Sequence, residues 1–118
     1  MNFDSYESLE NWMLSRKRSA DLKNIHSYLI ECVEREARSL VEHAVSTGRA
    51  QRRSKGLLKE CTKDAQEHYC EEINEAFASN EPLHHWTMMS YRRKPHAWAV
   101  AKGILEFIER KNATNTED

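Results

Sequence analysis

The chain has 118 residues, of which 31% are charged, with only three Gly and two Pro and a formal net charge of −1. This length suits one domain with a single core, and the scarcity of Gly and Pro argues against a β-sandwich rich in turns. The charge balance excludes a global attraction to nucleic acid or anionic lipid, so any such attraction must be local. No apolar run approaches the ~18 residues of a membrane span, so we expect no membrane partner.

The N-terminus and the cysteines favour a cytoplasmic location. The first seven residues are polar and acidic, unlike the basic start and apolar middle of a signal peptide. Cys32, Cys61 and Cys70 are odd in number and lie in helical stretches, whereas a disulfide framework prefers an even count and an oxidising compartment. We therefore expect three reduced thiols, with Cys32 and Cys61 on apolar faces.

The first predicted helix covers about residues 5–15. Ser5 supplies N-terminal capping chemistry, and the cations of Arg16–Arg18 follow the C-terminus, where the helix dipole favours them. Its apolar side is formed by Tyr6, Leu9 and Met13, with Phe3 just before it.

Two long helices, predicted over residues 20–47 and 57–79, dominate the pattern. Apolar residues recur three and four apart in both, which is the spacing of one apolar stripe. In the first they are Leu22, Ile25, Leu29, Cys32, Val33, Ala37, Leu40, Val41 and Ala44, and in the second Leu58, Cys61, Ala65, Tyr69, Ile73, Ala76 and Phe77. Gly48 is well placed to stop the first helix, and the pair predicts a long antiparallel helical hairpin.

Two further helices are predicted over about residues 82–92 and 95–111. Pro82 suits a helix start, and Pro95 ends the first of these helices and opens the second. The last helix is expected to bury Trp98, Ala101, Ile104, Leu105 and Ile108. The fold class is therefore all-α, a compact four- or five-helix bundle built on the hairpin, with a single helical domain over residues 1–111 and a polar tail over 112–118.

Positive charge is concentrated between the helices. Ten of the eighteen Lys and Arg residues fall in three segments free of Asp and Glu, at residues 16–18, 49–55 and 92–94. If these segments met on one face, they could bind a phosphate backbone. Simple up-down topology instead puts the first two clusters at opposite ends, so solvated connectors with helix-terminal cations are the favoured interpretation. The candidate nucleic-acid-binding residues are Arg49, Arg52, Arg53 and Lys55.

An acidic stripe follows the outer side of the third predicted helix. Asp64, Glu67, Glu71 and Glu75 lie three and four residues apart. Such a stripe would repel a nucleic acid and could suit a basic protein surface, although a solvated helical face needs no partner.

Three other site classes find no support in the sequence. After Gly48, a helix-turn-helix motif needs apolar residues where Arg49 and Ser54 stand. No cysteine pair has zinc-site spacing, and no Glu-x-x-His pair lies inside a helix, so we expect no metal, and His68 to bond with Glu72. Neither a nucleophile–base motif nor a Gly-rich phosphate loop is present, so we expect no catalytic residues, no cofactor and no enzyme activity.

The stretch from His84 to Trp98 is rich in aromatic residues, methionines and cations, the types enriched at protein interfaces. The same mixture can stack single-stranded bases, and a buried short helix is a third interpretation. In helical geometry Trp86 can face the core, which leaves Met88 and Tyr91 more exposed. The candidate partner-binding residues are Trp86, Met88, Tyr91, Arg92, Arg93 and Lys94.

The sequence thus favours a non-catalytic binding or regulatory protein, of the inhibitor or adaptor type, that acts through a protein–protein interface. The alternative is a nucleic-acid-binding protein that uses its basic connectors. The identity of the partner is open, as is self-association of the chain.

Overall fold

Serine residues define the start of each of the three N-terminal helices. The computed structural model describes residues 1–16, 18–86 and 95–114, and its first helices are α1 (Tyr6–Leu14), α2 (Ala20–Ser46) and α3 (Lys55–Ala78). Before each helix a serine hydroxyl accepts a hydrogen bond from the backbone N–H three residues later. These bonds satisfy N–H groups that lack a partner inside the helix. The three serines are Ser5, Ser19 and Ser54.

The remaining described elements are a single 3₁₀ turn, η1 (Leu83–His85), and helix α5 (Pro95–Thr114). The helix expected over residues 82–92 is described only at its start. There Pro82 precedes the 3₁₀ turn and its carbonyl accepts a hydrogen bond from the backbone N–H of His85 at 2.9 Å. The described residues contain helices and no strand, so the predicted all-α class is confirmed.

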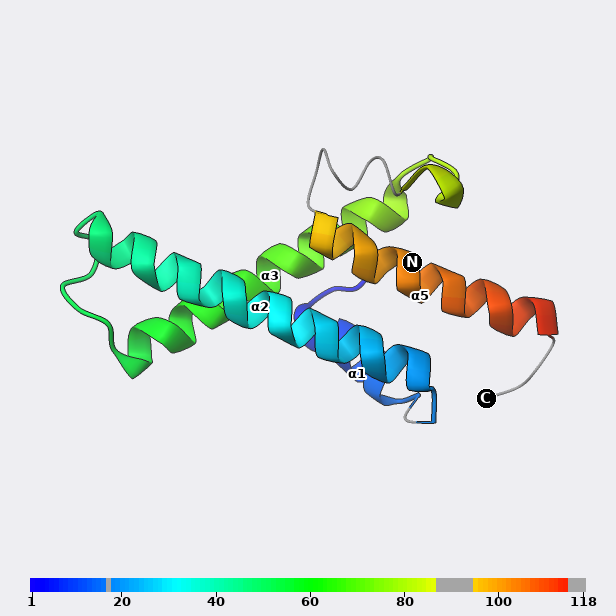
Figure 1. Cartoon of the computed structure of the whole chain (residues 1–118), viewed down its shortest axis with the longest axis horizontal. Helices are drawn as coiled ribbons and strands as arrows, with labels where there is room; N and C mark the ends of the chain where they lie inside the picture. The colour runs from blue at the N-terminus through cyan, green and yellow to red at the C-terminus, as the bar shows by residue number, and fades with distance from the viewer. Residues whose placement is uncertain (17, 87–94, 115–118) are drawn as a thin grey trace.

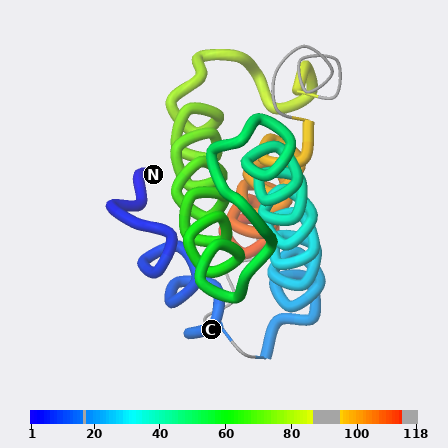
Figure 2. The backbone as a smooth tube through the Cα atoms, turned by 90° about the vertical axis from the view of Figure 1, so that its left-hand side faces the viewer, coloured from blue at the N-terminus to red at the C-terminus, as the bar shows by residue number. Residues whose placement is uncertain are grey.

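Helices α2, α3 and α5 lie side by side around the core, and α1 packs against α2 and α3. In the end-on view α1 lies beside α3 (Figure 2). Helices α2 and α3 run in opposite directions and cross along their length (Figure 1). The largest fully buried side chains come from all four helices: Leu9, Leu22, Leu29, Ile73, Trp98, Val100 and Ile104. Four core residues, Cys70, Ala97, Val100 and Phe107, were not predicted.

Helix α5 covers only the first part of α2. The contacts between the two helices include Arg110 with Asp21 (3.1 Å) and Tyr28 with His96 (2.6 Å between Oη and Nδ1). Between them, Gly103 lies so close to α2 that an added Cβ would be 2.8 Å from the Ile25 side chain. The distal parts of α2 and α3 therefore extend past α1 and α5, at the left of Figure 1.

This extension makes the molecule elongated. Its principal extents are 55 × 30 × 21 Å and its radius of gyration is 16.0 Å, against about 13.5 Å for a compact domain of this length. We refer to residues 38–63, which form the projecting end of α2, the connector and the start of α3, as the tip.

One predicted core residue is exposed because of this geometry. Leu58 continues the apolar spacing of α3 but is 44% exposed. It lies in the first turn of α3, inside the tip, where α1 and α5 do not reach. Helical spacing identifies the side of a helix that faces its neighbour, but it does not reveal where the neighbouring layer stops.

Candidate functional site

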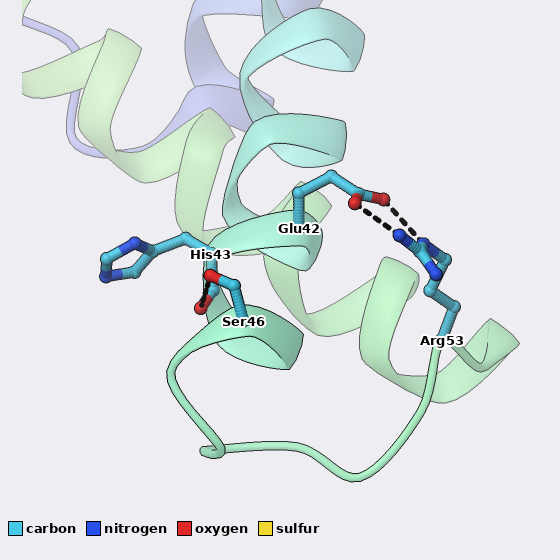
Figure 3. Close-up of polar contacts among 4 residues, drawn as sticks. All are labelled: Glu42, His43, Ser46 and Arg53. Atoms are coloured by element: carbon cyan, nitrogen blue, oxygen red, sulfur yellow. Dashed lines mark hydrogen bonds and ion pairs between the residues drawn. The ribbon is translucent and has the colours of Figure 1, made fainter.

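The connector between α2 and α3 is a closed turn whose basic side chains lie at the surface. Helix α2 ends at Ser46, and Gly48, two residues later, has a φ of +78°. The N–H of Ala50 then donates to the carbonyl of Ala44 at 3.0 Å. The Ser46 hydroxyl donates to the carbonyl of His43 at 3.1 Å (Figure 3). A positive φ suits glycine because it has no Cβ, so the predicted stop at Gly48 is confirmed.

The four candidate nucleic-acid-binding residues, Arg49, Arg52, Arg53 and Lys55, are exposed at the tip. Three of them belong to the connector and Lys55 is the first residue of α3. The tip as a whole contains seven Lys and Arg residues against two Glu, a formal charge of +5, while the rest of the chain sums to −6. The near-neutral chain therefore consists of one strongly basic end and an acidic remainder.

Arg53 is held by a carboxylate of α2. Its guanidinium makes a two-pronged contact with Glu42, with Nε donating to Oε1 at 2.5 Å and Nη2 donating to Oε2 (Figure 3). This contact lowers the pKa of the Glu42 carboxyl and raises the pKa of Arg53. Both side chains are well exposed, so the pair orients the connector on α2 more than it stabilises the fold.

The N-terminus of α3 carries an unusual charge for its position. The first turn contains no acidic residue, and Lys55 opens the helix. The aligned peptide dipoles make a helix N-terminus positive, so a lysine there is unfavourable and a negative group is favourable. The tip thus holds positive charge that its own acidic residues do not balance.

A groove separates the end of α2 from the start of α3. It has a volume of about 390 Å³, with Val41 and Leu58 supplying apolar surface. Its other lining residues are polar or charged, namely Arg38, Glu42, Arg53, Ser54 and Lys55. A second, wider depression runs along α3 from Lys55 to Gln66, and Leu58 borders both.

The acidic stripe begins where the basic tip ends. Along α3 the exposed lysines Lys55, Lys59 and Lys63 are followed at the same spacing of four by the exposed glutamates Glu67, Glu71 and Glu75. Asp64 is also exposed. The sign of the charge therefore changes within one helical turn, and the basic surface along α3 is limited to about 12 Å.

Trp86 belongs to the core. Its side chain is 3% exposed, its ring centroid lies 5.2 Å from that of Trp98, and its Nε1 donates to the carbonyl of Glu81 at 3.1 Å. A ring held in this way has no free surface for a partner, so we remove Trp86 from the candidate contact residues. The other five, Met88, Tyr91, Arg92, Arg93 and Lys94, lie outside the described residues.

The first basic cluster does not join the tip. Arg16 lies at the end of α1 and donates to the carbonyl of Trp12 at 3.0 Å, with its guanidinium 4.1 Å from the centroid of a Trp12 ring. The end of α1 is remote from the connector (Figure 1). A single surface made from the Arg16 and Arg49 clusters is therefore excluded, and the third cluster, residues 92–94, lies outside the described part.

His68 bridges two carboxylates, one of which was predicted. Its Nε2 lies 3.7 Å from Glu72 and its Nδ1 lies 3.4 Å from Glu36 on α2. The two ring nitrogens thus lie near different carboxylates, one on α2 and one on α3. Within residues 1–16, 18–86 and 95–114, no group of three or more His, Cys, Asp or Glu side chains is arranged to hold a metal ion.

All three cysteines are buried. All three thiols are free, and burial raises the pKa of both Cys61 and Cys70. A raised pKa lowers the fraction of thiolate, which is the nucleophilic form.

No protein-family model, curated protein or solved structure matches the chain significantly. None of the described helices has the combination of length and apolar character that crossing a bilayer requires. Sequence reasoning missed the contribution of α2 to the tip, namely Arg38, Val41 and Glu42. The closest signal was the opposite charge of Glu42 and Arg53, but these residues lie eleven positions apart, on either side of the predicted helix stop at Gly48, so no spacing within one helix relates them.

Proposed function

We propose that this chain is a non-catalytic binding protein that places its basic tip on an acidic surface of another protein. The observation that carries the proposal is the combination of the tip's charge of +5 with its position at the projecting end of the molecule (Figure 1). A projecting end can reach a partner without displacing the core helices. Charge complementarity of this kind speeds association and selects partners.

Two features favour a protein over a nucleic acid. The basic surface on α3 is short, and the acidic residues that follow Lys63 would repel a phosphate backbone extending along the helix. Leu58 also offers apolar surface in the middle of the charges, which a protein side chain can cover and a phosphate backbone cannot.

Nucleic-acid binding is the second candidate. It is supported by the exposure of Arg49 and Arg52 together on the connector, next to Lys55. This binding would depend steeply on salt and would be insensitive to sequence.

Affinity capture from a lysate of the native host, with and without nuclease, tests the proposal. The tip variant replaces Arg49, Arg52 and Lys55 with Ala, and the matched control replaces three exposed cations outside the tip, Arg18, Lys23 and Arg35. We expect a protein to be captured in the presence of nuclease by the native chain and the control, and to be lost with the tip variant. Capture that disappears on nuclease treatment would support the second candidate, and equal capture by both variants would contradict the use of the tip.

A further inference from the structure

The groove at the tip has an apolar floor inside a charged rim. Val41 is 6% exposed and closes the α2 side, while the side chain of Leu58, 44% exposed, stands open on the α3 side. Large apolar side chains exposed to this extent are rare in the described residues: the others are Met1 and Leu14. Leu58 borders this groove.

The rim of the groove is arranged for negative charge. Arg38 stands on α2, and Lys55 and Arg53 stand at the start of α3 and on the connector. Glu42 is the acidic residue of the lining, and it is already engaged with Arg53. A carboxylate entering beside Arg38 or Lys55 therefore meets positive charge and the positive end of the α3 dipole.

From this arrangement we infer that the groove receives an apolar side chain of a partner segment in which carboxylates flank that side chain. The occupant is an acidic amphipathic peptide segment, with an aliphatic or aromatic anchor over Val41 and Leu58 and its acidic groups beside Arg38 and Lys55. This inference rests on the proposed function and adds the chemistry of the partner. An anchor in a pocket, surrounded by charges that fix its register, is a common arrangement of peptide recognition.

A second copy of this chain is a poorer occupant. Its acidic stripe on α3 could meet the basic rim, but none of the large exposed apolar side chains of the described residues lies in that stripe. Self-association would bring charge to the groove without an anchor.

Fluorescence anisotropy with labelled peptides of about 15 residues tests the inference, a length of about four helical turns. One peptide carries two Leu four residues apart, flanked by Glu, and a second has Ser in place of both Leu. The third probe is a single-stranded oligonucleotide. All are measured at ~50 and ~200 mM salt, a range that separates screened from unscreened charge contacts.

We expect the Leu-containing peptide to bind the native chain at least tenfold more tightly than the Ser-containing peptide. Leu58→Ser and Arg38→Ala should each weaken its binding by about five- to tenfold, and Arg38→Ala should also flatten the salt dependence. The matched controls are Leu14→Ser, a leucine of the same 44% exposure at the far end of α1, and Lys23→Ala, an exposed cation outside the tip. Both should leave binding unchanged, and Leu58→Met, which keeps an apolar side chain, should retain most of it.

Three results would overturn the inference. Equal binding of the two peptides would show that charge alone acts, which contradicts the groove but leaves the proposed function standing. If Leu58→Ser and Arg38→Ala left the affinity for the Leu-containing peptide unchanged, the groove would not be its binding site. Tighter binding of the oligonucleotide than of either peptide, with loss in the triple variant of Arg49, Arg52 and Lys55, would replace both proposals with nucleic-acid binding.

Discussion

The side-chain amide of Asn74 binds both backbone groups of Phe3. Its Nδ2 donates to the Phe3 carbonyl at 2.7 Å, and its Oδ1 accepts from the Phe3 N–H at 2.8 Å. The amide thus satisfies the N–H and the carbonyl of the same backbone residue. It fixes the Phe3 ring between Trp12 and Phe77, whose centroids lie 6.0 and 6.1 Å away.

Replacing Asn74 should loosen the N-terminal segment. Asn74→Ala leaves the Phe3 N–H without its partner and the Phe3 carbonyl with only the weak thiol donor of Cys70 at 3.7 Å, so we expect a loss of about 1–3 kcal/mol in the free energy of unfolding. Denaturant unfolding followed by tryptophan fluorescence measures it. Asn74→Asp keeps an acceptor for the N–H but faces the carbonyl with another oxygen, and should also destabilise. An unchanged midpoint for both variants would show that the contact is incidental.

Truncating a core side chain should cost more stability than truncating Leu58 at the tip. Leu29 and Ile104 are both fully buried, so Leu29→Ala and Ile104→Ala should each cost about 2–5 kcal/mol. Leu58→Ala removes a side chain that is partly in water, and we expect less than about 1 kcal/mol. Thermal unfolding of the three variants gives the comparison. A loss at Leu58 as large as at Leu29 would mean that the tip is more fully packed than its exposure indicates.

A charge reversal at Lys55 should stabilise the free protein and weaken binding. A glutamate at the first position of α3 suits the positive end of the helix dipole, so Lys55→Glu should gain about 0.3–1 kcal/mol at low salt. It should also reduce binding of the Leu-containing acidic peptide, because the rim of the groove loses a cation. The control is Lys63→Glu, the same reversal inside the helix near Glu60 and Glu67, which should destabilise through like-charge contacts. If both substitutions changed the free energy of unfolding in the same direction, the dipole argument would be contradicted.

The contact between Glu42 and Arg53 should make the stability of the protein depend slightly on pH. The contact places the pKa of Glu42 in the folded protein below its ordinary value of 4.5, so its stabilising effect is present above that value and is lost as the pH falls through the folded-state pKa. Glu42→Gln should therefore have a lower melting temperature than the native chain at pH ~7, and the difference should shrink near pH ~3. A difference that stays constant with pH would argue against the ion pair.

The sequence predicted the parts of this fold that depend on local pattern. The stripe on α2, the start of α2 at Ala20 and the stop at Gly48 follow from helical periodicity and capping, which are properties of neighbouring residues. On α5 the prediction was correct for Trp98, Ala101 and Ile104, whereas Leu105 and Ile108 are only partly buried. The exposure of Leu58 was missed because it depends on where α5 ends, and the contact of Asn74 with Phe3 because it joins residues 71 positions apart. At the site, exposed connector cations were predictable from composition, whereas the groove required the relative placement of α2 and α3.

The separation of charge along this chain has a consequence for its behaviour in solution. A molecule 55 Å long, with +5 at the tip and −6 over the remainder, is a large electric dipole even though its net charge is −1. The screening length is about 8 Å at physiological ionic strength and about 30 Å at 0.01 M. In physiological salt a neighbouring molecule therefore interacts electrostatically with only the end that it approaches. In dilute buffer the field of the whole dipole extends further, and the molecules orient one another head to tail. Added salt should accordingly raise the solubility of this protein, most strongly near its isoelectric point.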